Sequence, residues 1–133
     1  MIKQSLMMAA LVLALSSQGA SAHSQTPGYK KIATPGDHMD VTYELKNEFD
    51  FPIILRIDVL EKDGSIADES SWETQRRYFK MRPGSEKSVT ARIFMGNSNE
   101  RKVMVCSVLD KVGYEETNPT TITRVCSRLW LWR

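Results

Sequence analysis

The sequence has few of the residues that build reactive or metal-binding centres. Its 133 residues include only two cysteines and two histidines, which are too few and too widely spaced for a four-ligand zinc site. It contains no G-x-S-x-G nucleophile motif and no glycine-rich phosphate-binding loop. The acidic residues alternate with other polar residues, as they do on a solvated sheet face. We therefore expect a protein that is not an enzyme and that needs no cofactor.

An excess of charge of one sign is also missing, and so is a long apolar run. Beyond residue 22 the chain carries 17 basic and 16 acidic side chains. A nucleic-acid-binding domain would have a clustered basic excess, so we expect no nucleic-acid partner. The apolar run Leu6–Leu15 is shorter than the ~20 residues that cross a bilayer as a helix. No membrane span is expected in the mature chain.

The first 22 residues have the order of a cleavable secretory signal. Lys3 supplies a positive charge, Leu6–Leu15 is a short apolar core, and Ala20-Ser-Ala22 is a small-residue cleavage pattern. A buried N-terminal helix is the alternative interpretation. We expect residues 1–22 to be a signal peptide and residues 23–133 to form one exported domain.

From Met39 onward apolar and polar residues alternate with a period of two, which is typical of strands with one wet face. Turn residues such as Asp63-Gly64 and Pro83-Gly84 separate these segments. The polar stretch 66–77 is expected to connect two sheets. Seven or so short strands in about 100 residues predict an all-β, immunoglobulin-like sandwich. Strands are expected at Met39–Lys46, Ile53–Leu60, Tyr78–Met81, Ser88–Ile93, Lys102–Leu109 and Thr120–Trp132, and the last two are the clearest.

Both cysteines lie in the last two expected strands. An even cysteine count in an exported chain favours one disulfide, between Cys106 and Cys126. If these residues face each other in an antiparallel pair, Met104 lies opposite Arg128 on the same face, and the other face is mostly apolar. Closing a loop of ~20 residues would contribute about 3 kcal/mol to stability.

The end of the chain, Leu129-Trp-Leu-Trp132, places bulky apolar residues on both faces of the last strand. A strand with one face in water does not have this pattern. Either another sheet covers the outer face, or a partner protein does.

Four segments resemble the N-terminal domain of PapD-like periplasmic pilus chaperones. Val41–Asn47 and Phe51–Ile57 carry an Asn followed by a turn that contains a proline. Tyr78–Ile93 is an aromatic strand that leads through a proline turn into a strand ending in Arg-Ile. The closing Arg124–Arg133, in which basic residues run into an aromatic-rich end, is similar to the family's last strand. One branch of the family also joins its last two strands by a disulfide.

The resemblance implies protein binding in the periplasm by strand addition, with a pilin or a secretion-apparatus subunit as partner. The lending strand would be Ile122–Trp132, whose possible groove-filling residues are Ile122, Val125, Leu129 and Leu131. The family also clamps the partner's C-terminal carboxylate with two basic residues. Here these would be Lys30 or Lys31 together with Arg124 or Arg128. The family has a second sandwich domain, whereas the 133 residues of this chain suffice for one domain. We therefore expect a single-domain relative, an accessory of a pilus, secretion or conjugation apparatus.

Two other functions stay open. Cleavage after Ala22 would make His23 the first residue, and its amine and imidazole would form a copper site with the imidazole of His38. The start of the exported chain is similar to that of some secreted copper proteins. The third interpretation is a structural subunit of a surface apparatus.

Overall fold

The computed structural model describes residues 23–112 and 123–133, so the expected signal peptide at 1–22 lies outside the described residues. The described chain forms strands joined by turns, with a single 3₁₀ turn at Glu69–Ser71. No helix in it is both long and apolar enough to cross a membrane. The strands are β1 His23–Thr26, β2 Tyr29–Ala33, β3 His38–Asn47, β4 Ile53–Glu61, β5 Trp72–Thr74, β6 Tyr78–Met81, β7 Glu86–Phe94, β8 Glu100–Val112 and β9 Arg124–Trp132.

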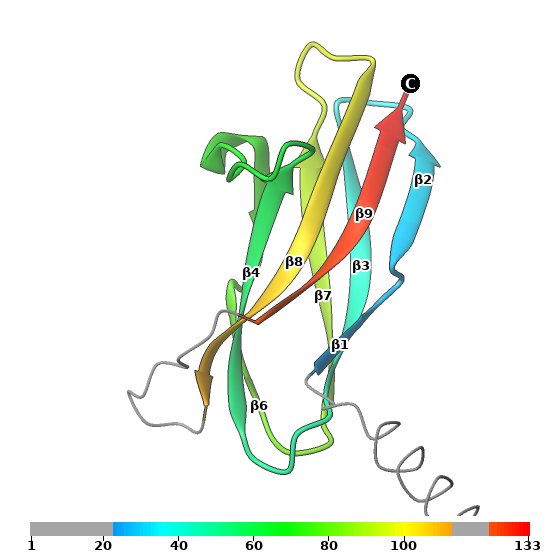
Figure 1. Cartoon of the computed structure of the whole chain (residues 1–133). Coiled ribbons are helices and arrows are strands. Elements are labelled where there is room, and N and C mark those ends of the chain that lie inside the picture. The colour runs from blue at the N-terminus through cyan, green and yellow to red at the C-terminus, as the bar shows by residue number, and fades with distance from the viewer. Residues whose placement is uncertain (1–22, 113–122) are drawn as a thin grey trace, which may run out of the picture.

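These strands form two sheets that pack face to face as a sandwich (Figure 1). The first sheet has the order β1-β3-β7-β5, and the second has the order β2-β9-β8-β4-β6. Neighbouring strands are antiparallel except β2 and β9, which run parallel. The all-β, immunoglobulin-like sandwich predicted from the sequence is confirmed.

The alternating pattern does not reveal three of these strands, β1, β2 and β5. Each is short and mostly polar, so it carries too few apolar residues to show a period of two. The stretch 66–77 is therefore more than a connection between sheets. It pairs Ile66 with Leu60 and includes β5, whose Trp72 packs into the core.

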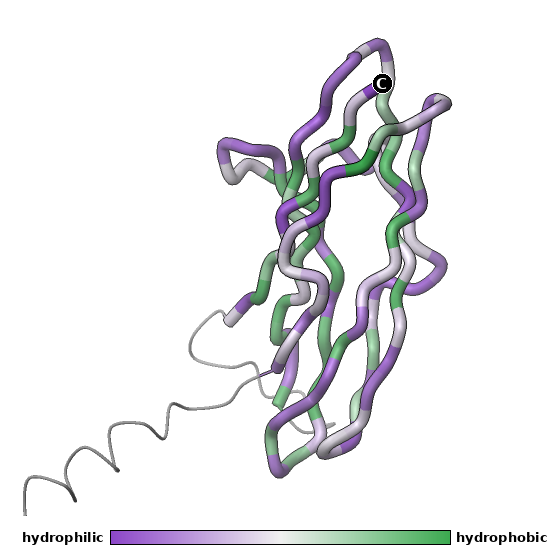
Figure 2. The backbone as a smooth tube through the Cα atoms, turned by 90° about the vertical axis from the view of Figure 1, so that its right-hand side faces the viewer, coloured by the Kyte–Doolittle hydropathy of each residue, from purple (hydrophilic) through white to green (hydrophobic). Residues whose placement is uncertain are grey.

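The core between the sheets consists of the inward-facing apolar residues of both sheets. Tyr43, Leu45, Leu55, Ile57 and Ile93 are each completely buried, and burying one such aliphatic side chain contributes roughly 1.5–3 kcal/mol. Apolar and polar residues alternate along the strands, as Figure 2 shows. The burial therefore follows the period of two in the sequence.

The buried side chain of Asn47 holds together the turns at one end of the sandwich. Its amide donates hydrogen bonds to the carbonyl groups of Phe51 (3.0 Å), Met81 (3.2 Å) and Arg82 (3.2 Å). Its side-chain oxygen accepts a hydrogen bond from the Phe49 N–H at 2.9 Å. One residue thus joins the β3–β4 turn to the β6–β7 turn.

The N-terminal part of the chain changes sheets between β1 and β2 and covers only part of each sheet's edge. β1 pairs with Glu44–Asn47 of β3, and β2 pairs with Arg128–Trp132 of β9. In the part of the chain that the structure describes, no strand pairs with Arg124–Ser127 of β9 on the side away from β8. We call Arg124–Ser127 the open half of β9.

Candidate partner-binding site on the last strand

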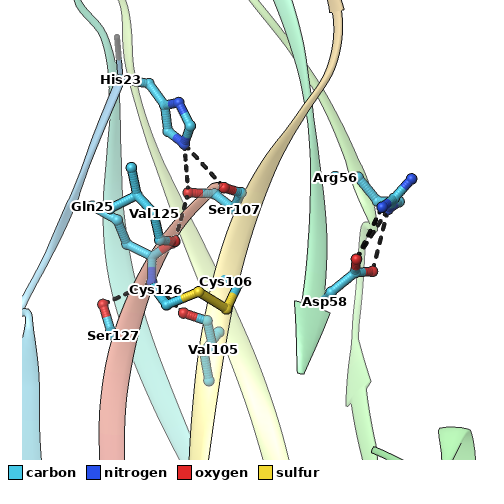
Figure 3. The surroundings of a disulfide bond; sticks show 10 residues. All are labelled: His23, Gln25, Arg56, Asp58, Val105, Cys106, Ser107, Val125, Cys126 and Ser127. Atoms are coloured by element: carbon cyan, nitrogen blue, oxygen red, sulfur yellow. Dashed lines mark hydrogen bonds and ion pairs between the residues drawn. A yellow bond between two sulfur atoms is a disulfide. The ribbon is translucent and has the colours of Figure 1, made fainter. Parts of the chain in front are cut away.

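The last two strands have the register that the cysteine pair predicts. Cys106 lies opposite Cys126, and Met104 lies opposite Arg128. The two cysteines form a disulfide (Figure 3), which confirms the predicted pairing. The disulfide lies on the outer face of the second sheet, where Cys106 packs with Leu60 outside the main core. It therefore fastens the open half of β9 to β8, the only described strand that pairs with it.

The inward-facing leucines of β9 belong to the protein's own core. Leu129 is 1% exposed and Leu131 is 0% exposed, and both pack in the main core cluster. The sequence predicts that both leucines fill a partner's groove. In this conformation they fill the protein's own core instead. Val125 is half-buried in the open half of β9, and Ile122 lies outside the described residues.

The backbone of the open half offers hydrogen-bonding groups at the sheet edge. The Leu109 N–H donates to the Thr123 carbonyl (2.8 Å), whereas the Arg128 N–H donates to the Gly28 carbonyl (2.9 Å). Successive residues of a strand direct these groups to opposite sides. Odd-numbered residues of β9 therefore bond toward β8. Arg124 and Cys126 direct their N–H and C=O groups to the side that no described strand covers.

A row of buried polar side chains lies behind the open half. The Gln25 side-chain amide donates to the Val105 carbonyl and to the Ser127 hydroxyl, both at 2.7 Å (Figure 3). His23 Nε2 lies 3.0 Å from both the carbonyl oxygen and the hydroxyl of Ser107. These contacts tie β1 of one sheet to β8 and β9 of the other. The sequence signal for this row is a serine at an inward-facing position of each of the last two strands.

Burial controls the protonation of His23. The side chain is 4% exposed, and desolvation lowers its pKa below the usual value of 6.5, against the opposing effect of the Ser107 backbone hydrogen bond. The neutral imidazole is therefore the form that the sandwich favours.

The two histidines of the copper interpretation are far apart. His23 pairs with Asn47 at the end of β3, whereas His38 is the first residue of β3. Nine residue steps along a strand span roughly 30 Å. Among the described residues, no group of three His, Cys, Asp or Glu side chains is placed to hold a metal ion. The structure does not bring His23 and His38 together, so the copper site predicted from this pair is not formed.

Two of the four candidate basic residues lie together on the outer face. Lys31 pairs with Trp130 and its Nζ lies 4.0 Å from the centre of the Trp130 ring. Arg128 lies one row away, opposite Tyr29. Lys30 pairs with the inward-facing Leu129, so it lies on the other face of β2. The geometry thus groups Lys31 with Arg128, whereas Arg124 lies farther along β9, beyond the disulfide.

The outward-facing tryptophans of β9 are not covered by another described sheet. Lys102 approaches the Trp130 ring at 4.3 Å, so this ring has a lysine ammonium from each neighbouring strand. Trp132 remains 43% exposed. The sequence leaves open whether another sheet or a partner protein covers this outer face. In the described part of the chain no other sheet covers it.

Solved structures with the same fold include the periplasmic chaperone SfaE. It matches with a TM-score of 0.62 and 10% sequence identity, over 84% of this chain and 57% of SfaE. A chain from the complex of Salmonella enterica SafA pilin with the SafB chaperone matches with a TM-score of 0.63 and 12% identity, over 86% of this chain and 56% of that one. PapD-like domain 7 of human CEP192 matches with a TM-score of 0.60 and 10% identity, over 83% of each chain.

No protein-family model and no curated protein matches the sequence. The chain spans little more than half the length of the two bacterial chains. The same fold thus occurs in a human protein as well. The resemblance to PapD-like pilus chaperones is confirmed as a likeness of fold, because the chain forms the same β-sandwich as these structures.

Proposed function

We propose that this protein is a non-enzymatic, chaperone-like factor that binds a protein subunit in the periplasm during pilus assembly or a related process. The observation that carries the proposal is the open half of β9, a sheet edge at which no described strand pairs with the outward-directed backbone groups of Arg124 and Cys126. An extended segment of a partner can extend the sheet at such an edge.

The structural neighbours support the cellular setting and the class of partner. SfaE is described as a periplasmic chaperone, and another neighbour comes from a complex of a pilin with its chaperone. An exported sandwich with a disulfide fits an oxidising compartment.

The contact mode differs from the one that the sequence suggested. Because Leu129 and Leu131 fill the protein's own core, the partner would contact the edge backbone and the outward-facing side chains instead. The disulfide would hold this edge in place, since β8 is the only described strand that pairs with it. Backbone hydrogen bonds supply affinity in this mode, and the flanking side chains supply selectivity.

Lys31 and Arg128 would receive the carboxylate at the partner's C-terminus. They share the outer face beside the covered half of β9, and neither forms an ion pair with any carboxylate that the structure describes. A carboxylate bound by two cations gains charge-assisted hydrogen bonds.

The test uses one position with two substitutions. Arg124→Pro removes a backbone N–H on the open side of β9 without removing a hydrogen bond to β8. Arg124→Ala removes the side chain but keeps that N–H, so it is the matched control. Each variant would be co-expressed in the periplasm with pilin subunits of the producing organism, and the complex would be measured by co-purification. We expect Arg124→Ala to retain the complex and Arg124→Pro to lose it. Equal complex formation by both variants would contradict strand addition at this edge.

A further inference from the structure

The opposite side of the sandwich has a second incomplete edge. β5 pairs only with Ala91–Ile93 of β7, so Glu86–Thr90 has no strand partner on that side within the described ranges. On the other sheet, β6 is the edge strand and pairs only with β4. This edge lies across the molecule from the open half of β9, because β5 and β6 end the sheets that β1 and β2 begin.

An open hollow of about 520 Å³ lies along the unpaired part of β7. Its walls include Arg76, Phe79 and the β7 residues Lys87–Thr90. Lys87 also lines a neighbouring hollow with Lys80 and Lys111. We call the two hollows together the β7 groove.

The β7 groove gathers positive charge in a chain that is otherwise nearly balanced. Six cations line it or its rim. Arg77 is paired with Asp58 and Glu69. The other five form no ion pair with a carboxylate in the described chain: Arg76, Lys80, Arg82, Lys87 and Lys111. Among the described lining residues the one carboxylate is Asp110, which is already bonded to Arg56 at 3.2 Å. Unpaired charges gathered around a hollow attract a ligand of opposite sign.

The position of Lys87 favours a narrow ligand. Lys87 is half-buried and lies on the same face of β7 as the buried Val89, so its stem enters the edge of the sandwich. A flat anionic membrane would meet protruding lysines but would not reach such a side chain. A single extended chain can enter the groove and also bond to the backbone groups of β7 that no described strand pairs with on this side.

We propose that the β7 groove binds an extended acidic peptide segment. The segment adds a strand at Glu86–Thr90 and directs alternate carboxylates toward Lys87 and Lys80. This site is separate from the open half of β9, so the protein can hold two protein segments at once.

The probe is a synthetic ten-residue peptide that alternates Asp with Thr. A control peptide has the same five Asp residues and five prolines in the order Asp-Asp-Pro-Pro, repeated and ended by Asp-Pro, so it carries equal charge while proline removes N–H groups from both edges of the strand. Binding would be measured by isothermal titration and by NMR shifts of the Glu86–Thr90 amides. The variants are Lys80→Gln and Lys87→Met, which keeps the aliphatic stem, and Lys62→Gln on another part of the surface removes the same charge as a control.

We expect the Asp-Thr peptide to bind and to shift the Glu86–Thr90 amides, with affinity that falls as salt rises. Each groove substitution should weaken binding about threefold, and the pair about tenfold, as expected for exposed charge pairs. Lys62→Gln and Arg124→Pro should leave binding unchanged. Equal binding of the proline peptide, equal loss in Lys62→Gln, or binding only to vesicles of anionic lipid or to a sulfated polysaccharide would each overturn the proposal.

Discussion

Removing the disulfide tests how the open half of β9 is held. The perturbation is the double substitution Cys106→Ala and Cys126→Ala. The bridged residues are 20 positions apart, and a crosslink that closes a loop of this length stabilises the fold by about 3 kcal/mol. Cys106 is also fully buried, so loss of its sulfur should cost about 1 kcal/mol more. The expected loss is therefore about 3–4 kcal/mol, a large share of the 5–15 kcal/mol typical of a domain.

The assay is urea unfolding followed by circular dichroism, together with thermal melting. A loss of this size should lower the Tm by about 15 °C, because each kcal/mol shifts the Tm of a domain near 100 residues by roughly 4 °C or more. The wild-type protein in strong reductant is the control, and its stability should fall to a similar value. A loss below about 1 kcal/mol in the double variant would refute the reasoning, because the crosslink would then constrain little of the unfolded chain.

Three further substitutions test the buried polar contacts. Desolvation lowers the pKa of His23 from 6.5, so the unfolded chain takes up a proton at higher pH than the folded chain does. The free energy of unfolding in urea should therefore fall as the pH is lowered from 7.5 to 5, a range above the ordinary aspartate pKa of 3.8. His23→Gln should make this fall smaller. An equal fall in both proteins would show that His23 is not its cause. Asn47→Ala leaves three carbonyl groups and one N–H without their partner and should lower the free energy of unfolding by about 2–4 kcal/mol in the same assay. The control Asn97→Ala, at an exposed position, should lower it by less than about 0.5 kcal/mol. Similar losses in both variants would show that the Asn47 side chain does not hold the two turns together. Asp58→Asn weakens the ion pairs of Asp58 with Arg56 (3.0 Å) and Arg77 (3.1 Å) and should lower the free energy of unfolding by about 1–2 kcal/mol. The control Glu86→Gln, at an exposed ion pair with Lys46, should lower it by less than about 0.5 kcal/mol. Equal losses in the two variants would show that the ion pairs of Asp58 add no stability.

The register of the last two strands could be predicted because two independent signals agree. The period of two assigns each side chain to a face, and the cysteine pair sets which residues lie opposite each other. The short polar strands β1, β2 and β5 give neither signal, so their places in the sheets could not be predicted.

The role of Leu129 and Leu131 shows a different limit. An alternating apolar strand reads the same whether it fills its own core or a partner's groove, because the period of two specifies a face and not which protein covers it. The choice between Lys30 and Lys31 has a similar cause. It depends on the parallel register of β2 on β9, and a five-residue strand with one partly buried residue does not encode that register.

The central claim is that half of β9 is an open sheet edge. The most direct measurement is amide hydrogen exchange of the isolated protein, resolved by residue with NMR. The Arg128 N–H is bonded to Gly28 and should be strongly protected, and the amides of Val125 and Ser127 should be protected by β8. The amides of Arg124 and Cys126 should exchange at close to the rate of an unstructured peptide. Strong protection of Arg124 and Cys126 in the isolated protein would show that this edge is already occupied and would contradict the account.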